Sequence, residues 1–155
     1  MRPARLFSDD RGFRRDVLAA LRELKPSIVR WPGGCFASGY RLTNGVGKWR
    51  HSVPDPVWGG QDPNTFGTGE FVEWCRRVGC EPYICSNAGD GMADEMSAWV
   101  EHCTDGRPVA GCAGRMGLAS WPFDIGSIGN ERGGHEIGAR TPQEWGPASS
   151  SDRPS

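Results

Sequence analysis

The sequence has almost no net charge and no long apolar run. Its 18 Lys and Arg residues nearly balance 19 Asp and Glu residues, so the formal net charge is −1. A balanced charge gives no electrostatic basis for attraction to nucleic acid or to an anionic membrane surface. No stretch approaches the ~20 apolar residues of a membrane-spanning helix. We therefore expect neither a nucleic-acid partner nor a membrane partner.

The sequence also lacks a secretory signal and a metal-binding pattern. Its first residues do not contain the apolar segment of a signal peptide. No pair of the six cysteines has the C-x-x-C spacing of zinc sites and thioredoxin-like motifs. His51, His102 and His135 are dispersed along the chain. These absences predict a cytoplasmic protein with reduced, buried thiols and no metal cluster.

Glycine, proline and tryptophan are abundant by contrast. The chain has 23 Gly, 12 Pro and 7 Trp, which indicates many tight turns. Its 155 residues, 37% hydrophobic and 24% charged, are enough for one globular domain with a core.

Helical and strand patterns alternate along the chain. Apolar stripes at helical spacing predict helices, and short runs rich in β-branched residues predict strands. The predicted elements, in chain order, are a helix over 10–24 with N-cap candidates at 8–10, a strand over 27–30, a helix over 71–78, a strand over 81–86 and a helix over 96–103. This alternation indicates α/β units with a parallel sheet.

Three loops follow the predicted strands, and in parallel α/β units such loops form the functional sites. These loops cover residues 31–36, 87–91 and 129–135. Residues 37–67 show no period, so they predict a long loop that is either functional or disordered.

The last predicted strand ends in a polar pair. Residues 123–128 suit a buried strand, Gly129 allows a sharp turn, and Asn130 and Glu131 follow. A carboxyl group at the end of a strand can give a proton to a leaving oxygen and later take one from water. The alternative is a solvated loop acid beside a turn asparagine, because motifs this short recur by chance.

Four motifs in order resemble one known family. They are Arg30-Trp31-Pro32-Gly33-Gly34-Cys35-Phe36, Val57-Trp58-Gly59-Gly60 with Pro63-Asn64 and Phe66-Gly67, Glu81-Pro82-Tyr83-Ile84-Cys85, and Ile128-Gly129-Asn130-Glu131. Together they resemble glycoside hydrolase family 51, the intracellular-type α-L-arabinofuranosidases, over residues 10–146. The resemblance implies a (β/α)8 TIM barrel, of which this chain would supply roughly strands 2–4 with their helices.

The resemblance also implies an activity and a set of site residues. The family hydrolyses terminal non-reducing α-L-arabinofuranosyl groups of oligosaccharides and polysaccharides with retention, needs no metal or cofactor, and often forms homo-oligomers. Glu131 matches the general acid/base, and Asn130 matches the residue that binds the sugar 2-hydroxyl. Arg30 would support the active-site carboxylates, Cys35 would lie near the sugar, and Trp58 would line the sugar pocket.

The chain is shorter than the ≈ 250 residues of a full barrel. We therefore expect residues 1–155 to be an incomplete catalytic barrel domain, with a disordered or altered tail over 147–155. The family nucleophile, a Glu on a late strand, is expected to be absent from this chain. Three hypotheses stay open: a fragment that carries the acid/base half of the site, an inactive remnant or weak pentose-binding half-barrel, and a structural protein that reuses half a barrel.

Overall fold

Helices and strands alternate in the structure in the predicted order. The computed structural model describes residues 8–47, 49–105 and 126–130. The helices are α1 (Arg15–Leu24), α2 (Thr68–Val78) and α3 (Ala93–Asp105), and the strands of the main sheet are β1 (Ile28–Trp31), β4 (Glu81–Ser86) and β5 (Gly126–Ile128). Two 3-10 helices, η2 (Gly34–Ser38) and η3 (Leu42–Gly45), and a hairpin of β2 (Val53–Pro54) and β3 (Gln61–Asp62) lie between β1 and α2.

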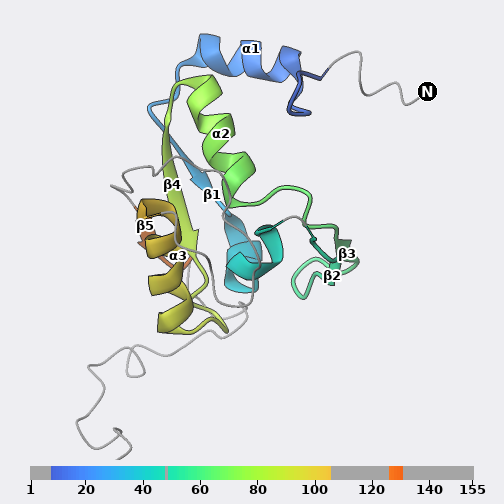
Figure 1. Ribbon diagram of the computed structural model, residues 1–155, viewed down its shortest axis with the longest axis vertical. Helices are drawn as coiled ribbons and strands as arrows, with labels where there is room; N and C mark the ends of the chain where they lie inside the picture. Colours follow the sequence, from blue (N-terminus) through green and yellow to red (C-terminus); the bar gives the residue numbers. More distant parts are fainter. Residues whose placement is uncertain (1–7, 48, 106–125, 131–155) are drawn as a thin grey trace, which may run out of the picture.

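The main sheet is parallel, with the order β1-β4-β5 and β4 at its centre. Figure 1 shows α1 at the end of the sheet where the strands begin, with β1 and β4 running away from it. The predicted α/β class with a parallel sheet is therefore confirmed.

One face of the sheet is packed against helices. Ile84 on β4 is buried in a cluster with residues of all three helices, and Val29 and Trp31 on β1 pack against that cluster. Its members are Leu18, Tyr40, Leu42, Val46, Phe71, Cys75, Val78, Cys80, Ile84, Trp99 and Cys103. Ile28 and Arg30, which alternate with Val29 and Trp31, are exposed. Because side chains alternate across a strand, Arg30 lies on the face opposite the helices.

The first helix begins later than the sequence predicted. The prediction placed its start at residue 10, but α1 begins at Arg15. The carboxylate of Asp9 accepts hydrogen bonds from the N–H groups of Arg11 and Phe13, both at 2.9 Å. Asp9 therefore closes a turn over the residues that the apolar stripe assigned to the helix, and it does not act as an N-cap.

Residues 37–67 are ordered wherever the structure describes them. Tyr40, Leu42 and Val46 are buried in the main cluster. The guanidinium of Arg50 makes two hydrogen bonds to the Glu70 carboxylate at the start of α2, at 2.9 and 3.0 Å. This segment is folded against the helices rather than disordered.

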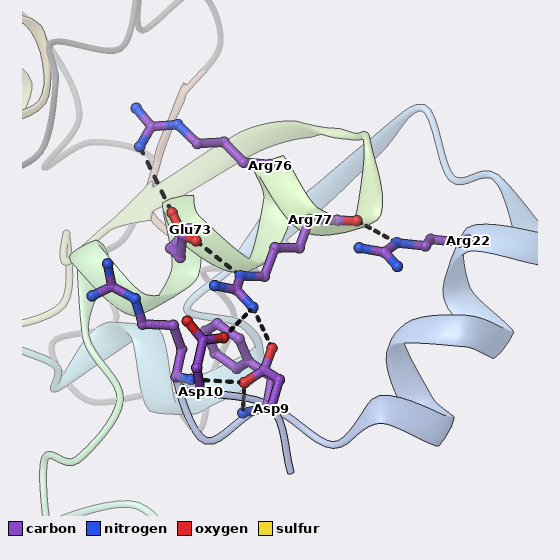
Figure 2. Close-up of polar contacts among 8 residues, drawn as sticks. Asp9, Asp10, Arg22, Glu73, Arg76 and Arg77 are labelled. Atoms are coloured by element: carbon purple, nitrogen blue, oxygen red, sulfur yellow. Dashed lines mark hydrogen bonds and ion pairs between the residues drawn. The ribbon is translucent and has the colours of Figure 1, made fainter.

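Charged side chains link the residues before α1 to α2 (Figure 2). The guanidinium of Arg77 donates to Glu73 at 2.8 Å, to Asp10 at 3.2 Å and to Asp9. It also lies over the ring of Phe13, 5.6 Å from the centroid. The backbone carbonyl of the same arginine accepts a hydrogen bond at 2.5 Å from Arg22 on α1.

Removing the charge of Asp9 is expected to change the acid stability of the protein. Burial raises the pKa of this carboxyl, but the N–H groups of Phe13 and Arg11 and the charge of Arg77 outweigh burial and lower the pKa below its ordinary value. A lowered pKa stabilises the fold above the unfolded-state pKa, and this stabilisation is lost as the pH falls through the folded-state pKa. Asp9→Asn should therefore lower the Tm by a few degrees at pH 7 and by less at pH 2.

Thermal melts of wild type and Asp9→Asn from pH 7 to pH 2 measure this difference. Asp10→Asn is the matched control, since the Asp10 side chain is 76% exposed and should contribute little at either pH. Parallel Tm curves for wild type and Asp9→Asn across this range would contradict the role of Asp9.

Candidate active site at the carboxyl ends of the strands

The three parallel strands end at one edge of the sheet. Trp31 at the end of β1 pairs with Ile84 on β4, and Ser86 at the end of β4 pairs with Ile128 at the end of β5. The segments that follow β1, β4 and β5 therefore leave the sheet at the same edge. This is the edge at which barrel enzymes place their chemistry.

Arg30 lies next to this edge. It is the penultimate residue of β1, and its side chain is exposed on the face opposite the helices. A Cβ atom added to Gly33 would lie 3.8 Å from its Nη2 atom, so the guanidinium extends along the strand toward the loop after β1. The positive charge of Arg30 is thus available at the edge.

Asn130 follows β5 at the same edge, and only 5% of its surface is exposed. Gly129 before it has φ +88°, in the left-handed region that favours glycine. The Ser86 hydroxyl donates to the carbonyl of Ser127 at 2.8 Å, which fixes the end of β5 against β4. Glu131 lies outside the described residues, as do the predicted residues 123–125 of the strand and the predicted tail.

The loop after β4 is closed by one asparagine. The Asn87 amide donates to the carbonyl of Tyr40 at 3.2 Å and to Asp90 at 2.8 Å. Its oxygen accepts from the N–H groups of Gly89 at 2.9 Å and Gly91 at 3.2 Å. A Cβ at Gly91 would lie 2.3 Å from the Asn87 carbonyl oxygen, so glycine is required at that position. The sequence placed a loop here, and its Asn-x-Gly spacing is the signal that identifies this turn.

A second link joins the segment after η2 to α3 and to the loop after β4. The carboxylate of Glu95, on α3, accepts hydrogen bonds from Arg41 at 2.7 Å and from the N–H of Leu42 at 3.2 Å. Arg41 also lies 3.3 Å from the Asp90 carboxylate. The hydrogen bond to Glu95 raises the pKa of Arg41. The sequence analysis missed this pair, because no local pattern connects residues 54 positions apart.

Cys35 and Trp58 lie in different parts of the structure. Cys35 is half-buried in η2, directly after the two glycines that follow β1. Trp58 lies in the turn between β2 and β3, where its N–H and that of Val57 donate to Asp55, and its side chain is 73% exposed. In Figure 1 the β2–β3 hairpin lies on the side of β1 away from β5. Cys35 therefore lies in the segment that directly follows β1, the strand of Arg30, whereas Trp58 lies on the separate β2–β3 hairpin.

Within the described parts of the chain, no three His, Cys, Asp or Glu side chains are grouped as metal ligands. None of the helices described there is both long and apolar enough to cross a membrane. A cleft of about 470 Å³ lies between α3 and the β4–β5 pair. Its lining includes Ile84, Met96, Trp99 and Val100, so it is a mainly apolar space on the helix side of the sheet, and it reaches Ser86 and Ser127 near the ends of their strands.

Comparison with known proteins identifies the family. Residues 20–134 match the model of the α-L-arabinofuranosidase 1 domain, which is most of the chain. The chain belongs to the family 51 α-L-arabinofuranosidases. The resemblance of the four sequence motifs is thereby confirmed.

This chain matches only part of the length of its family 51 relatives and of the solved structures. α-L-Arabinofuranosidase C of Emericella nidulans is 47% identical over 107 residues, which are 68% of this chain and 21% of the relative. An intracellular exo-α-L-arabinofuranosidase of Bacteroides ovatus is 40% identical over 130 residues, 80% of this chain and 25% of the relative. The Thermotoga maritima α-L-arabinofuranosidase, solved as an arabinose complex, superposes with a TM-score of 0.78 at 37% identity, covering 90% of this chain and 30% of that structure.

The family 51 matches show that the described fold corresponds to one part of a larger protein structure. The chain spans between a fifth and a third of the length of the proteins it matches. Its parallel sheet and helices correspond to a part of the solved α-L-arabinofuranosidase structure.

Proposed function

We propose that this chain contributes the acid/base part of a retaining glycosidase site that releases terminal non-reducing α-L-arabinofuranosyl groups from arabinose-containing oligosaccharides and polysaccharides. The observation that carries the proposal is the common edge at which β1, β4 and β5 end. Arg30, near the end of β1, and Asn130, after β5, both lie at this edge. The arabinose complex of the Thermotoga maritima relative supports arabinofuranosyl groups as the substrate class.

In this proposal β1, β4 and β5 are strands two to four of a (β/α)8 barrel, and residues 1–155 belong to that catalytic domain. The helices on one face of the sheet then lie outside the barrel, and the face of Arg30 lies inside it. Because the chain spans a minority of the length of its relatives, the nucleophile and the closing strands come from polypeptide outside this sequence. We include in the same proposal that the complete enzyme forms a homo-oligomer, as members of the family often do.

The proposed mechanism uses two carboxyl groups about 5–5.5 Å apart. Glu131 gives its proton to the glycosidic oxygen while the nucleophile attacks the anomeric carbon, and Glu131 then takes a proton from the water that hydrolyses the covalent intermediate. Asn130 hydrogen-bonds the sugar 2-hydroxyl, a contact that strengthens in the transition state. Arg30 supports the two carboxylates by its positive charge, Cys35 lies near the sugar, and Trp58 lines the pocket.

A cytoplasmic location belongs to the same proposal. The Bacteroides ovatus relative is named as intracellular. The cysteines among the described residues form no disulfide, and Cys75, Cys80, Cys85 and Cys103 are buried, which fits a reducing compartment.

A chimera tests the proposed role of Glu131. Residues 20–134 of this chain replace the matching segment of the Thermotoga maritima enzyme, and turnover of an aryl α-L-arabinofuranoside is measured. Glu131→Gln in the chimera should lower kcat/KM by roughly 10²–10⁴-fold, the usual contribution of a general acid/base. Glu81→Gln is the control, because Glu81 is an exposed residue where β4 begins, at the opposite edge of the sheet.

The outcomes separate the hypotheses. An active chimera that loses activity with Glu131→Gln and keeps it with Glu81→Gln supports the assignment, and equal activity of all three overturns it. The 155-residue chain alone is tested for pentose binding by titrating its tryptophan fluorescence with L-arabinose. The exposed ring of Trp58 favours this second function, and saturable binding that Trp58→Ala removes would support a pentose-binding half-barrel.

A further inference from the structure

The end of α2 brings two cysteines together. Gly79 has φ +88° and terminates the helix, and the N–H groups of Gly79 and Cys80 both donate to the carbonyl of Cys75, at 2.8 and 3.1 Å. The bond from Cys80 is the 6→1 bond of a Schellman motif and the bond from Gly79 is the 5→1 bond of an αL motif, and in such helix ends the residue two positions after the helix contacts the residue at the start of its last turn. Those two residues are usually apolar, whereas here both have thiols.

The two thiols are adjacent and buried. Cys75 is 0% exposed and Cys80 is 5% exposed. The Cys80 thiol donates a hydrogen bond to the Cys75 carbonyl oxygen at 3.8 Å, and the two thiols are close enough to change each other's pKa. The backbone hydrogen bonds of the turn hold Cys80 beside Cys75, which is the proximity that a disulfide needs.

We propose that Cys75 and Cys80 form a dithiol site that a hydroperoxide oxidises to a disulfide, covalently joining the end of α2 to the start of β4. The sulfur of Cys80 attacks one oxygen of the hydroperoxide, the O–O bond breaks, and Cys80 becomes a sulfenic acid as the other oxygen leaves, protonated, as water or an alcohol. The sulfur of Cys75 then attacks the sulfenic sulfur, the S–S bond forms, and the S–O bond breaks with release of water. The two thiols lose two electrons and two protons, and the hydroperoxide takes up both.

The order of these steps follows from the exposure of the two thiols and from their effect on each other. Burial raises the pKa of both thiols, but the neighbouring Cys75 thiol lowers the pKa of Cys80 and opposes the effect of burial there. Cys80 is also the more exposed of the two. Cys80 is therefore the attacking thiol, and its burial makes the reaction slower than that of an exposed thiol.

Peptide mapping of the full chain tests the proposal. The protein is treated with hydrogen peroxide, remaining thiols are alkylated, and trypsin is added without reductant. Arg76 and Arg77 separate the two cysteines in the sequence, so trypsin cuts between them and only a disulfide keeps the two peptides joined. We expect a joined pair lighter by two hydrogens than the sum of its peptides, which separates on reduction. Fragmentation before Pro82 assigns the link to Cys80 rather than to Cys85, Cys103 or Cys112, which the same tryptic peptide contains.

A joined pair linked through Cys80 supports the proposal, and alkylation of both cysteines, or a link from Cys75 to another cysteine, overturns it. The second measurement is the rate of thiol loss under peroxide. Cys80→Ser should slow the loss at Cys75 at least ~10-fold, and Cys103→Ser is the matched control, because burial raises the pKa of Cys103 to about 12 and it lies on a different helix. If Cys80→Ser does not fold, the wild-type peptide map alone decides.

Discussion

Gly67→Ala is expected to lower the free energy of unfolding by about 3 kcal/mol, at the upper end of the usual cost of overpacking. A Cβ at this position would lie 2.1 Å from the carbonyl oxygen of Gly45 and 2.8 Å from its carbonyl carbon. Both are backbone atoms, so no side-chain rotation relieves the clash. The start of α2 and the end of η3 would have to separate, and this would expose Leu42 and Val46 on the same segment.

Urea denaturation of wild type and Gly67→Ala measures this cost. Gly33→Ala is the matched control, because both glycines have an extended backbone, with φ −131° at Gly67 and −128° at Gly33. A Cβ at Gly33 meets only the end of the Arg30 side chain, at 3.8 Å. Similar midpoints for the two variants would show that the close approach of Gly67 to Gly45 does not restrict the fold.

Trp31→Ala is expected to lower the free energy of unfolding by roughly 3–5 kcal/mol, as for other large aromatic residues removed from a core. The ring of Trp31 contacts rings from several parts of the chain. Its ring centroid lies 5.1 Å from that of Tyr40, 5.4 Å from Phe71, 5.9 Å from Phe66 and 6.1 Å from Trp99. Removing it therefore leaves a cavity where β1, α2, α3 and the segment after η2 meet.

Thermal unfolding of Trp31→Ala beside Trp58→Ala gives the comparison. Trp58 is 73% exposed, so its removal should change stability by no more than about 0.5 kcal/mol. Trp31→Phe keeps an aromatic ring and should fall between wild type and Trp31→Ala. Equal Tm values for the two alanine variants would contradict the central position of Trp31.

The helical spacing of apolar residues predicted a helix well where those residues are buried on one face of it. Phe71, Val72, Cys75 and Val78 recur at helical spacing and are all buried in α2. The stripe of α1 was less reliable, since Val17 is 42% exposed and Leu24 is 73% exposed. The predicted start of α1 was wrong because the Asp9 carboxylate closes a turn before the helix, and the spacing of apolar residues gives no sign of such a side-chain hydrogen bond.

Residues 37–67 show why the remainder of the fold was not predictable from local sequence. Tyr40 and Leu42 are buried by helices that come later in the chain, and β2 and β3 contain two residues each, too few to establish a period. The sequence predicted only that this segment is functional or disordered, because its fold depends on contacts such as that of Arg50 with Glu70.

The candidate site was predicted in part. The alternation of elements placed the loops after β1, β4 and β5 at one edge, and the structure confirms this arrangement. The roles of Arg30, Cys35, Trp58, Asn130 and Glu131 came from family resemblance and stay predictions. The contacts of Asn87, Arg41 and Glu95 were not predicted, because they join residues whose proximity only the folded chain creates.

The contacts of Arg41 with Glu95 and Asp90 tie the segment after η2 to the start of α3 and to the loop after β4. A ligand held at this edge, as proposed above, would find both segments already ordered, so the conformational entropy lost on binding would be smaller than for two independent segments. Substitutions of Arg41 or Glu95 should therefore loosen both segments together.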